Sequence, residues 1–271
     1  ALTEPQAEQL RALLAKLGDG APERLSDEYR AWQRRRVNTP MLKSIGRIRT
    51  PDAEGVVNLE AVDDPAFEGA LGEMKRVLLG ETPGSLVLTG PAGCGKSALL
   101  HVLSNRLAED GWIVFEASAN DLAAGQSFLG QLEGRVKDLA AELRGKDVVW
   151  IIPDFHELAF AGAYRERPTG VLDMLLPYIE SGEVRVVGET TTDAWHSLAV
   201  RFPRVRTALT ALRIESMSDE EALAFAQRWC VHARAQGWPV PDEPTLREIS
   251  LLGRQYLSSA AQPGAIMRLV Q

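Results

Sequence analysis

The chain of 271 residues has little cysteine, few aromatic side chains and no apolar run long enough to span a bilayer. Its two cysteines, Cys94 and Cys230, are far apart in the sequence and lack metal-site spacing, so we expect two reduced, single thiols. The first residues do not form a basic segment followed by an apolar run, as a secretory signal does. We therefore expect a cytoplasmic protein with no membrane role.

The chain also lacks an excess of positive charge, because 37 acidic residues outnumber 30 Lys and Arg and give a formal net charge of -7. Coating nucleic acid requires clustered Lys and Arg, so direct nucleic-acid binding is not expected. One basic cluster, Arg30 with Arg34, Arg35 and Arg36, lies where a predicted helix ends. It is either a solvated helix end, where the helix dipole favours cations, or a contact for an anion or partner.

The remaining composition is that of an ordinary globular chain, long enough for one large α/β domain and small satellites. Residues 1–36 are predicted to form an N-terminal helical appendage, with two helices interrupted at Gly18 and Gly20. Residues 37–58 contain scattered Pro and Gly with little periodicity, which predicts a linker.

Residues 59–216 alternate helices with short apolar strands. The expected helices are 66–79, one following residue 97 as far as 109, 129–143 and 168–181, and the expected strands are 85–89, 112–117, 148–152, 184–188 and 212–215. This order predicts a parallel five-stranded sheet between helices, with ligands at the carboxyl ends of the strands. Residues 217–271 contain no strand pattern, and a capping box at Ser218 opens the first of three helices of a predicted lid domain.

A glycine-rich loop joins the strand 85–89 to the next helix. It reads Gly90, Pro91, Ala92, Gly93, Cys94, Gly95, Lys96, Ser97, and Ala98 follows in the helix. This is the pattern G-x-x-x-x-G-K-[ST] between a strand and a helix, in which loop amides and the helix N-terminus surround phosphate oxygens. Lys96 would neutralise the β- and γ-phosphates and the Ser97 hydroxyl would ligate Mg²⁺, so we predict ATP or ADP with Mg²⁺ as cofactors.

Cys94 occupies a variable position of this loop and is not expected to be a catalytic thiol. Its place at a helix N-terminus would lower its pKa and make it sensitive to oxidation.

Three stretches, 125–135, 172–193 and 256–270, together with the glycine-rich loop, resemble the first ATPase module of Clp-type AAA+ unfoldases. The resemblance covers roughly residues 60–271 in order. It implies the AAA+ type of P-loop NTPase fold, a homo-oligomer in the form of a hexameric ring, and a protein substrate. It also implies modules beyond residue 271, so we expect a fragment.

The resemblance assigns substrate binding to Phe128, at the position of the aromatic residue that grips a threaded polypeptide in the central pore. The alternative is an inward core residue. Because Gly125, Gly130 and polar neighbours flank it, we expect a solvent-facing ring.

Thr190 matches the family's sensor residue, which hydrogen-bonds near the γ-phosphate and the attacking water. The alternative is a threonine that caps a strand end. The sensor interpretation is favoured because Thr190 ends an apolar strand expected next to the strand that leads into the loop.

The sequence departs from the family after the strand 148–152. Where the family has Asp-Glu, this chain has Pro153 and Asp154. Asp154 then falls at the position of the water-activating glutamate, but its side chain is one methylene shorter. Alternatively, Asp154 orders Mg²⁺ and Glu157 approaches the water. In either arrangement we expect weak hydrolysis.

The family's adjacent arginines, which complete a neighbour's site, align with Thr207 and Ala208 here. Arg201, Arg204 and Arg206 lie just upstream, and each is either such an arginine finger or a surface residue.

A second family arginine, the nucleotide-sensing residue near the start of the last helix, falls at Gly264 and Ala265. Arg268 lies one helical turn later.

Three functions fit these observations. The first is an ATP-driven subunit of a ring that remodels or unfolds a protein. The second is a nucleotide-dependent assembly or binding module with little hydrolysis. The third is a DNA-linked AAA+ loader or transposition-type regulator, against which the acidic balance counts.

Overall fold

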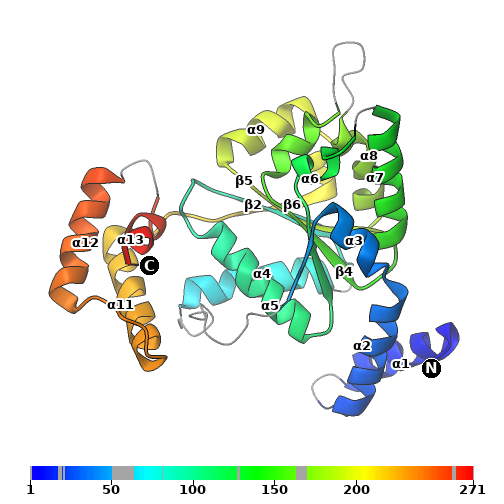
Figure 1. The fold of residues 1–271 in the computed structure, drawn as a ribbon, viewed down its shortest axis with the longest axis horizontal. Coiled ribbons are helices and arrows are strands. Elements are labelled where there is room, and N and C mark those ends of the chain that lie inside the picture. Colours follow the sequence, from blue (N-terminus) through cyan, green and yellow to red (C-terminus); the bar gives the residue numbers. More distant parts are fainter. Residues whose placement is uncertain are drawn as a thin grey trace.

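The computed structural model describes residues 2–17, 20, 22–50, 64–80, 82–126, 129–162, 170–257 and 261–270. Its described part contains one six-stranded sheet, in the order β1-β3-β4-β5-β2-β6. The strands are β1 (Arg47–Arg49), β2 (Ser85–Thr89), β3 (Ile113–Glu116), β4 (Val148–Ile152), β5 (Arg185–Thr190) and β6 (Leu209–Arg213). Figure 1 shows the sheet in the middle of the molecule with helices on both faces.

Strands β2 to β5 lie where the sequence predicts them, whereas β6 begins three residues before the expected strand 212–215. Every pairing among these five strands is parallel, as expected. Both β2 and β4 are buried at all five residues, because helices cover both faces of this part of the sheet. The register pairs Thr89 with Thr190, so the ends of β2 and β5 lie side by side.

The sixth strand was not predicted. Within the expected linker 37–58, the structure has α3 (Thr39–Ile45) and then β1, which pairs antiparallel with β3. Asn38 caps α3 by accepting a hydrogen bond from the Met41 amide, and the buried side chains of Leu42 and Ile45 join the main core. This part of the linker prediction is wrong, because a seven-residue helix and a three-residue strand are too short for periodicity to reveal.

Two helices, α4 (Pro65–Leu79) and α5 (Lys96–Glu109), cover one face of the sheet. Asp64 caps α4 by accepting hydrogen bonds from the Ala66 and Phe67 amides, both 3.1 Å long. The other face carries α6 (Ala119–Ala123), α7 (Leu129–Leu143), η3 (Phe155–Ala159), α8 (Val171–Glu180), α9 (Thr192–Arg201) and α10 (Val205–Ala208).

At the N-terminal end lie α1 (Glu4–Leu17) and α2 (Glu23–Arg36), which project from one corner of the molecule (Figure 1). The guanidinium of Arg36 pairs with Glu4 at 2.7 Å and lies 4.7 Å from the Trp32 ring centroid. Arg30 pairs with Asp27 at 3.5 Å. Arg35 donates a 3.1 Å hydrogen bond to the Ala31 carbonyl. These contacts favour the solvated helix end over an anion site, because three of the four arginines already have partners within the chain.

At the other end, α11 (Asp219–Ala235), α12 (Glu243–Tyr256) and α13 (Gly264–Val270) form a separate group of helices with its own apolar core (Figure 1). The predicted capping box is present, since Ser218 and Glu221 exchange side-chain and backbone hydrogen bonds. Arg228 joins this group, which we call the lid, to the start of α4 through a 2.6 Å ion pair with Asp64. Among the described residues, no helix is long and apolar enough to cross a membrane.

Substitution of Trp150 tests the packing of β4. Its ring is fully buried, and the indole N–H donates a 3.0 Å hydrogen bond to the Ala117 carbonyl. Replacing Trp150 by Phe removes this donor and leaves a buried acceptor without it, which should lower the free energy of unfolding by about 1–3 kcal/mol. Urea denaturation measures the change, with Trp238→Phe at a 44% exposed site as the control expected to have little effect. Equal effects of the two substitutions would contradict this account.

Candidate functional site

The glycine-rich loop of residues 90–97, called the phosphate loop below, turns between β2 and α5 as predicted. Gly93 and Gly95 adopt φ angles of 92° and 99°, in the left-handed region that favours glycine. At Gly90 the constraint is space, because a Cβ there would lie 2.3 Å from the Ile214 carbonyl oxygen. Three of the motif's glycines are therefore required by the backbone.

Lys96 is the buried cation of the phosphate loop. Its Nζ donates hydrogen bonds to the carbonyls of Gly90 at 2.9 Å and Pro91 at 2.8 Å. The ammonium group therefore lies inside the loop whose amides are expected to bind phosphate, where a cation is needed to balance the ligand's charge.

A cavity of about 520 Å³ opens beside the phosphate loop, within the size range of small-molecule sites. It lies between the loop, α4, the segment after β6, and the lid. Most of its surface is apolar, which suits a nucleotide base, and two cations, Arg213 and Arg268, also line it. The apolar lining comprises Phe67, Ala70, Leu99, Ile214, Met217, Phe225 and Met267.

The lid touches the phosphate loop directly. The amides of Ala261 and Gly264 donate 2.8 Å hydrogen bonds to the carbonyls of Ala92 and Gly93. A Cβ at Gly264 would lie 2.6 Å from the Gly93 oxygen, so only glycine fits this approach. Gly264, which aligns with the family's nucleotide-sensing arginine, is therefore explained by its close packing against the phosphate loop.

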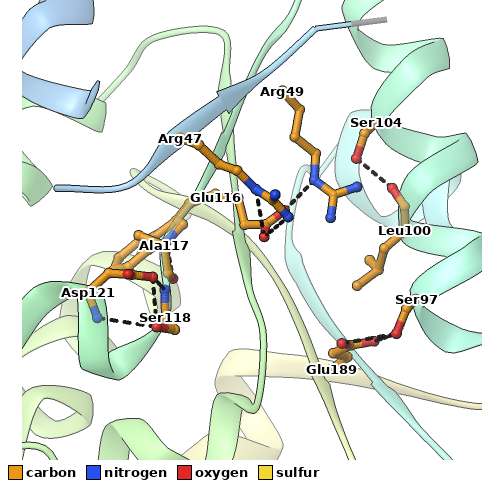
Figure 2. A network of polar contacts seen from close by, with 11 residues as sticks. Arg47, Arg49, Ser97, Leu100, Ser104, Glu116, Ala117, Ser118, Asp121 and Glu189 are labelled. Carbon is orange, nitrogen blue, oxygen red and sulfur yellow. Dashed lines mark hydrogen bonds and ion pairs between the residues drawn. The ribbon is translucent and has the colours of Figure 1, made fainter. Parts of the chain in front are cut away.

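Sequence reasoning missed Glu189, which lies on β5 directly before Thr190. The Ser97 hydroxyl donates to its carboxylate, with oxygen–oxygen distances of 3.0 and 3.2 Å, and Figure 2 shows the two side chains facing each other. Burial raises the pKa of Glu189, while Ser97 and Lys96 lower it and the charge of Asp154 raises it further. The available signal was the only carboxylate within the strand, one residue before its end.

Thr190 points to the opposite face of the sheet from Glu189, as neighbouring residues of a strand do. Its Oγ1 lies 2.9 Å from His156 Nδ1, and the side chain is buried. The contact is with η3 rather than with the phosphate loop. The sensor role remains a prediction.

Pro153 and Asp154 follow β4 at the expected edge. Asp154 is exposed, has φ 47°, and its side chain forms no hydrogen bond or ion pair with another described residue. Glu157, the alternative carboxylate, accepts a 3.4 Å hydrogen bond from Asn120. In this structure neither carboxylate is bonded to Ser97, and the catalytic and metal-binding roles of Asp154 remain predictions.

The three candidate finger arginines differ in their surroundings. Arg204 forms a two-pronged pair with Glu180, at 3.0 and 2.5 Å, and holds the pKa of that carboxyl below its usual value. Arg201 lies over the rings of Phe160 and Phe202, at 5.3 and 5.4 Å. Arg206 is exposed, and its side chain has no polar partner in the described ranges. Of the three, Arg206 alone can reach a neighbour without breaking a described contact.

Two further expectations concern single residues. Phe128 lies outside the described residues, so its exposure stays a prediction. The expected acidic thiol is wrong, because Cys94 is buried and burial raises the pKa of its thiol, an effect that outweighs the nearby Lys96 charge.

The site fits a nucleotide with a hard cation. The described residues contain no group of three His, Cys, Asp or Glu side chains that could hold a metal alone. The available donors are the exposed Ser97 hydroxyl and the Glu189 carboxylate, both oxygen ligands of the kind that Mg²⁺ uses together with substrate phosphates. Any Mg²⁺ here would therefore depend on the bound phosphates.

Comparison with protein families matches residues 69–250 to the AAA ATPase domain. Curated relatives include the chaperone protein ClpB of Corynebacterium glutamicum, 24% identical over 97% of this chain and 34% of that protein. Chloroplastic ClpC2 of Arabidopsis thaliana is 27% identical over 72% of this chain and 21% of its own length. The chain thus spans between about a fifth and a third of the length of these relatives.

Solved structures with the same fold include Saccharomyces cerevisiae Hsp104 in complex with casein, in an extended conformation. It has a TM-score of 0.62 and 20% identity, covering 74% of this chain and 36% of that one. The S. cerevisiae Hsp104–ADP complex has a TM-score of 0.61 and 21% identity, covering 74% and 36%. At this identity the likeness concerns the fold.

Lys96→Ala tests the phosphate loop. The substitution removes the buried cation, so ATP affinity should fall at least about tenfold, on the scale of one charge-assisted hydrogen bond. Isothermal calorimetry measures it. Lys75→Ala is the control, because Lys75 pairs with Asp110 at the far end of α5 and carries the same charge. Unchanged affinity in Lys96→Ala would remove this assignment.

Gly264→Ala tests the contact between the lid and the phosphate loop. The added methyl collides with the Gly93 backbone, so the amides of residues 261 and 264 should exchange with deuterium several-fold faster. Hydrogen-exchange mass spectrometry measures this rate. Gly253→Ala serves as control, since its Cβ would meet no atom closer than 3.5 Å. Similar exchange in both variants would show that the contact is not a constraint.

Proposed function

Since the chain belongs to the AAA ATPase domain family, we propose that it is the ATP-binding module of a ring-forming ATPase that remodels or unfolds a protein partner. The observation that carries the proposal is the phosphate loop, set between β2 and α5 and closed over by the lid around one cavity. Such an arrangement holds a nucleotide between two bodies whose relative position then depends on what is bound.

In this proposal each part of the site has one task. The phosphate loop binds the phosphates, Lys96 balances their charge, and Ser97 holds Mg²⁺. A bound Mg²⁺ would supply positive charge that offsets the negative charge of the phosphates. The apolar cavity side chains exclude water around the base, and the Gly264 contact joins the lid to the loop.

Support for a protein partner comes from the relatives, which are named as chaperone proteins, and from the Hsp104 structures that contain casein. The hexameric ring, the cytoplasmic location and a substrate grip at Phe128 belong to the same proposal. Thr190 is the proposed sensor, and Arg204 or Arg206 of a neighbouring copy would complete the site, with Arg206 the better placed.

A second function is favoured by Pro153 and Asp154. Proline offers only its carbonyl oxygen, and the Asp154 side chain extends into solvent. A module that binds ATP to control assembly, but hydrolyses it slowly, fits this edge of the sheet. Measurement of phosphate release from purified protein that has been shown to bind ATP discriminates the two. Turnover favours the motor, and binding without turnover favours the assembly module.

The double substitution Pro153→Asp with Asp154→Glu tests the cause of the slow hydrolysis that we expect. It introduces a second carboxylate after β4 and lengthens the first, so steady-state phosphate release should rise at least about tenfold, as for restored acid–base catalysis. Pro22→Asp, at the exposed start of α2, is the control. A starting protein that already turns over rapidly, with no gain from the double substitution, would show that hydrolysis here does not need these carboxylates.

A further inference from the structure

The ends of the neighbouring strands β4 and β5 differ in which of them carries an acidic residue. The register pairs Ile151 with Val187, and both side chains enter the core beneath α5. Because side chains on a strand alternate, the next residue of β5 toward that face is Glu189. On β4 the position two residues beyond Ile151 is Pro153, the first residue after the strand, so no carboxylate stands at the equivalent place.

The carboxylate on β5 is bonded to the side chain that is expected to hold the cation. Ser97 lies in the first turn of α5, and its hydroxyl donates to both oxygens of Glu189, at 3.0 and 3.2 Å (Figure 2). No other acceptor of the Ser97 hydroxyl is present in the described part of the chain. A serine hydroxyl that ligates a cation must turn a lone pair toward it, and the oxygens around it then face the same ion.

We propose that Glu189 supplies the carboxylate of the Mg²⁺ site, acting beside Ser97 from β5 in the place that Pro153 leaves empty on β4. This inference rests on the proposed binding of ATP. It assigns a metal-site role to a residue that the sequence pattern did not single out, and it deepens the proposed function without requiring hydrolysis.

The charges around Glu189 fit this role. The Glu189 carboxylate is partly buried. The positive charges of Lys96 and Arg49 stabilise its ionised form, and the negative charge of Asp154 opposes it. Arg49 is already paired with Glu116, as Figure 2 shows, and Lys96 is bonded to two loop carbonyls. The binding of ATP adds several negative charges beside a carboxylate, and a divalent cation between them would offset this repulsion.

Asp154 is the competing carboxylate, and its geometry is less suitable. It is exposed, lies beyond the end of β4, and is not bonded to Ser97. Glu189 lies within β5, where it pairs with Leu88 of β2, one residue beyond the last pair of β5 with β4. A metal ligand on a paired strand has a fixed direction, whereas one on an exposed turn must be ordered at each binding event.

The experiment measures how much Mg²⁺ strengthens nucleotide binding. The affinity of the whole chain for the slowly hydrolysed analogue ATPγS is determined by calorimetry with Mg²⁺ and with EDTA, and the ratio of the two is the Mg²⁺ gain. Glu189→Gln keeps an oxygen that accepts from Ser97 but removes the charge. Glu183→Gln is the matched control, because Glu183 precedes the same strand and pairs with Arg144 at 2.6 Å, away from the phosphate loop.

We expect Glu189→Gln to lower the Mg²⁺ gain at least tenfold while leaving affinity in EDTA unchanged or higher, and Glu183→Gln to behave as the starting protein. A full Mg²⁺ gain in Glu189→Gln would overturn the inference in either of two forms: both affinities for ATPγS unchanged, or both affinities reduced by the same factor. The second would mean that the carboxylate only shapes the loop. Circular dichroism and thermal melting establish that both variants are folded.

The same measurements separate this inference from the proposed function. If the starting protein binds ATPγS neither with Mg²⁺ nor with EDTA, the proposed nucleotide site itself is wrong. If the starting protein binds and Lys96→Ala does not, but Glu189→Gln keeps the full gain, the nucleotide site stands and only the role of Glu189 is lost.

Discussion

The parallel pairing of β2 with β5 is the constraint on which the site depends. It places Thr89, the last residue before the phosphate loop, level with Thr190, so the loop and the end of β5 share one edge of the sheet. The alternation of side chains then sends Glu189 toward Ser97 and Thr190 toward His156. A shift of the register by one residue would exchange these two directions, which is why the buried apolar strands matter for the chemistry.

The second element of the site is the lid, which meets the phosphate loop through backbone atoms. Hydrogen bonds between main-chain groups do not depend on side-chain identity, except where space is needed, as at Gly264. The lid has its own apolar core, and its position is set by this contact and by the ion pair of Arg228 with Asp64. A nucleotide in the cavity would touch both bodies, and this couples binding to their arrangement.

The polar groups at the strand ends divide into two sets. On the α5 side of the sheet, Ser97 is bonded to Glu189, and Lys96 is bonded to two carbonyls of the phosphate loop. Thr190 and His156 form a second group on the other face of the sheet. Hydrolysis would need a group from the second set, or from Asp154, to reach the phosphates, whereas binding needs only the first.

The sequence by itself determined the five parallel strands, the phosphate loop and the family, because long apolar runs and a complete glycine motif are local signals. Tertiary structure alone decided three features: the edge strand β1, the contact of the lid with the loop, and the pairing of Ser97 with Glu189. Ser97 and Glu189 are far apart in the sequence, and neither local sequence predicts a contact with the other residue. Strand order and register bring them together, and these follow from how the whole core packs.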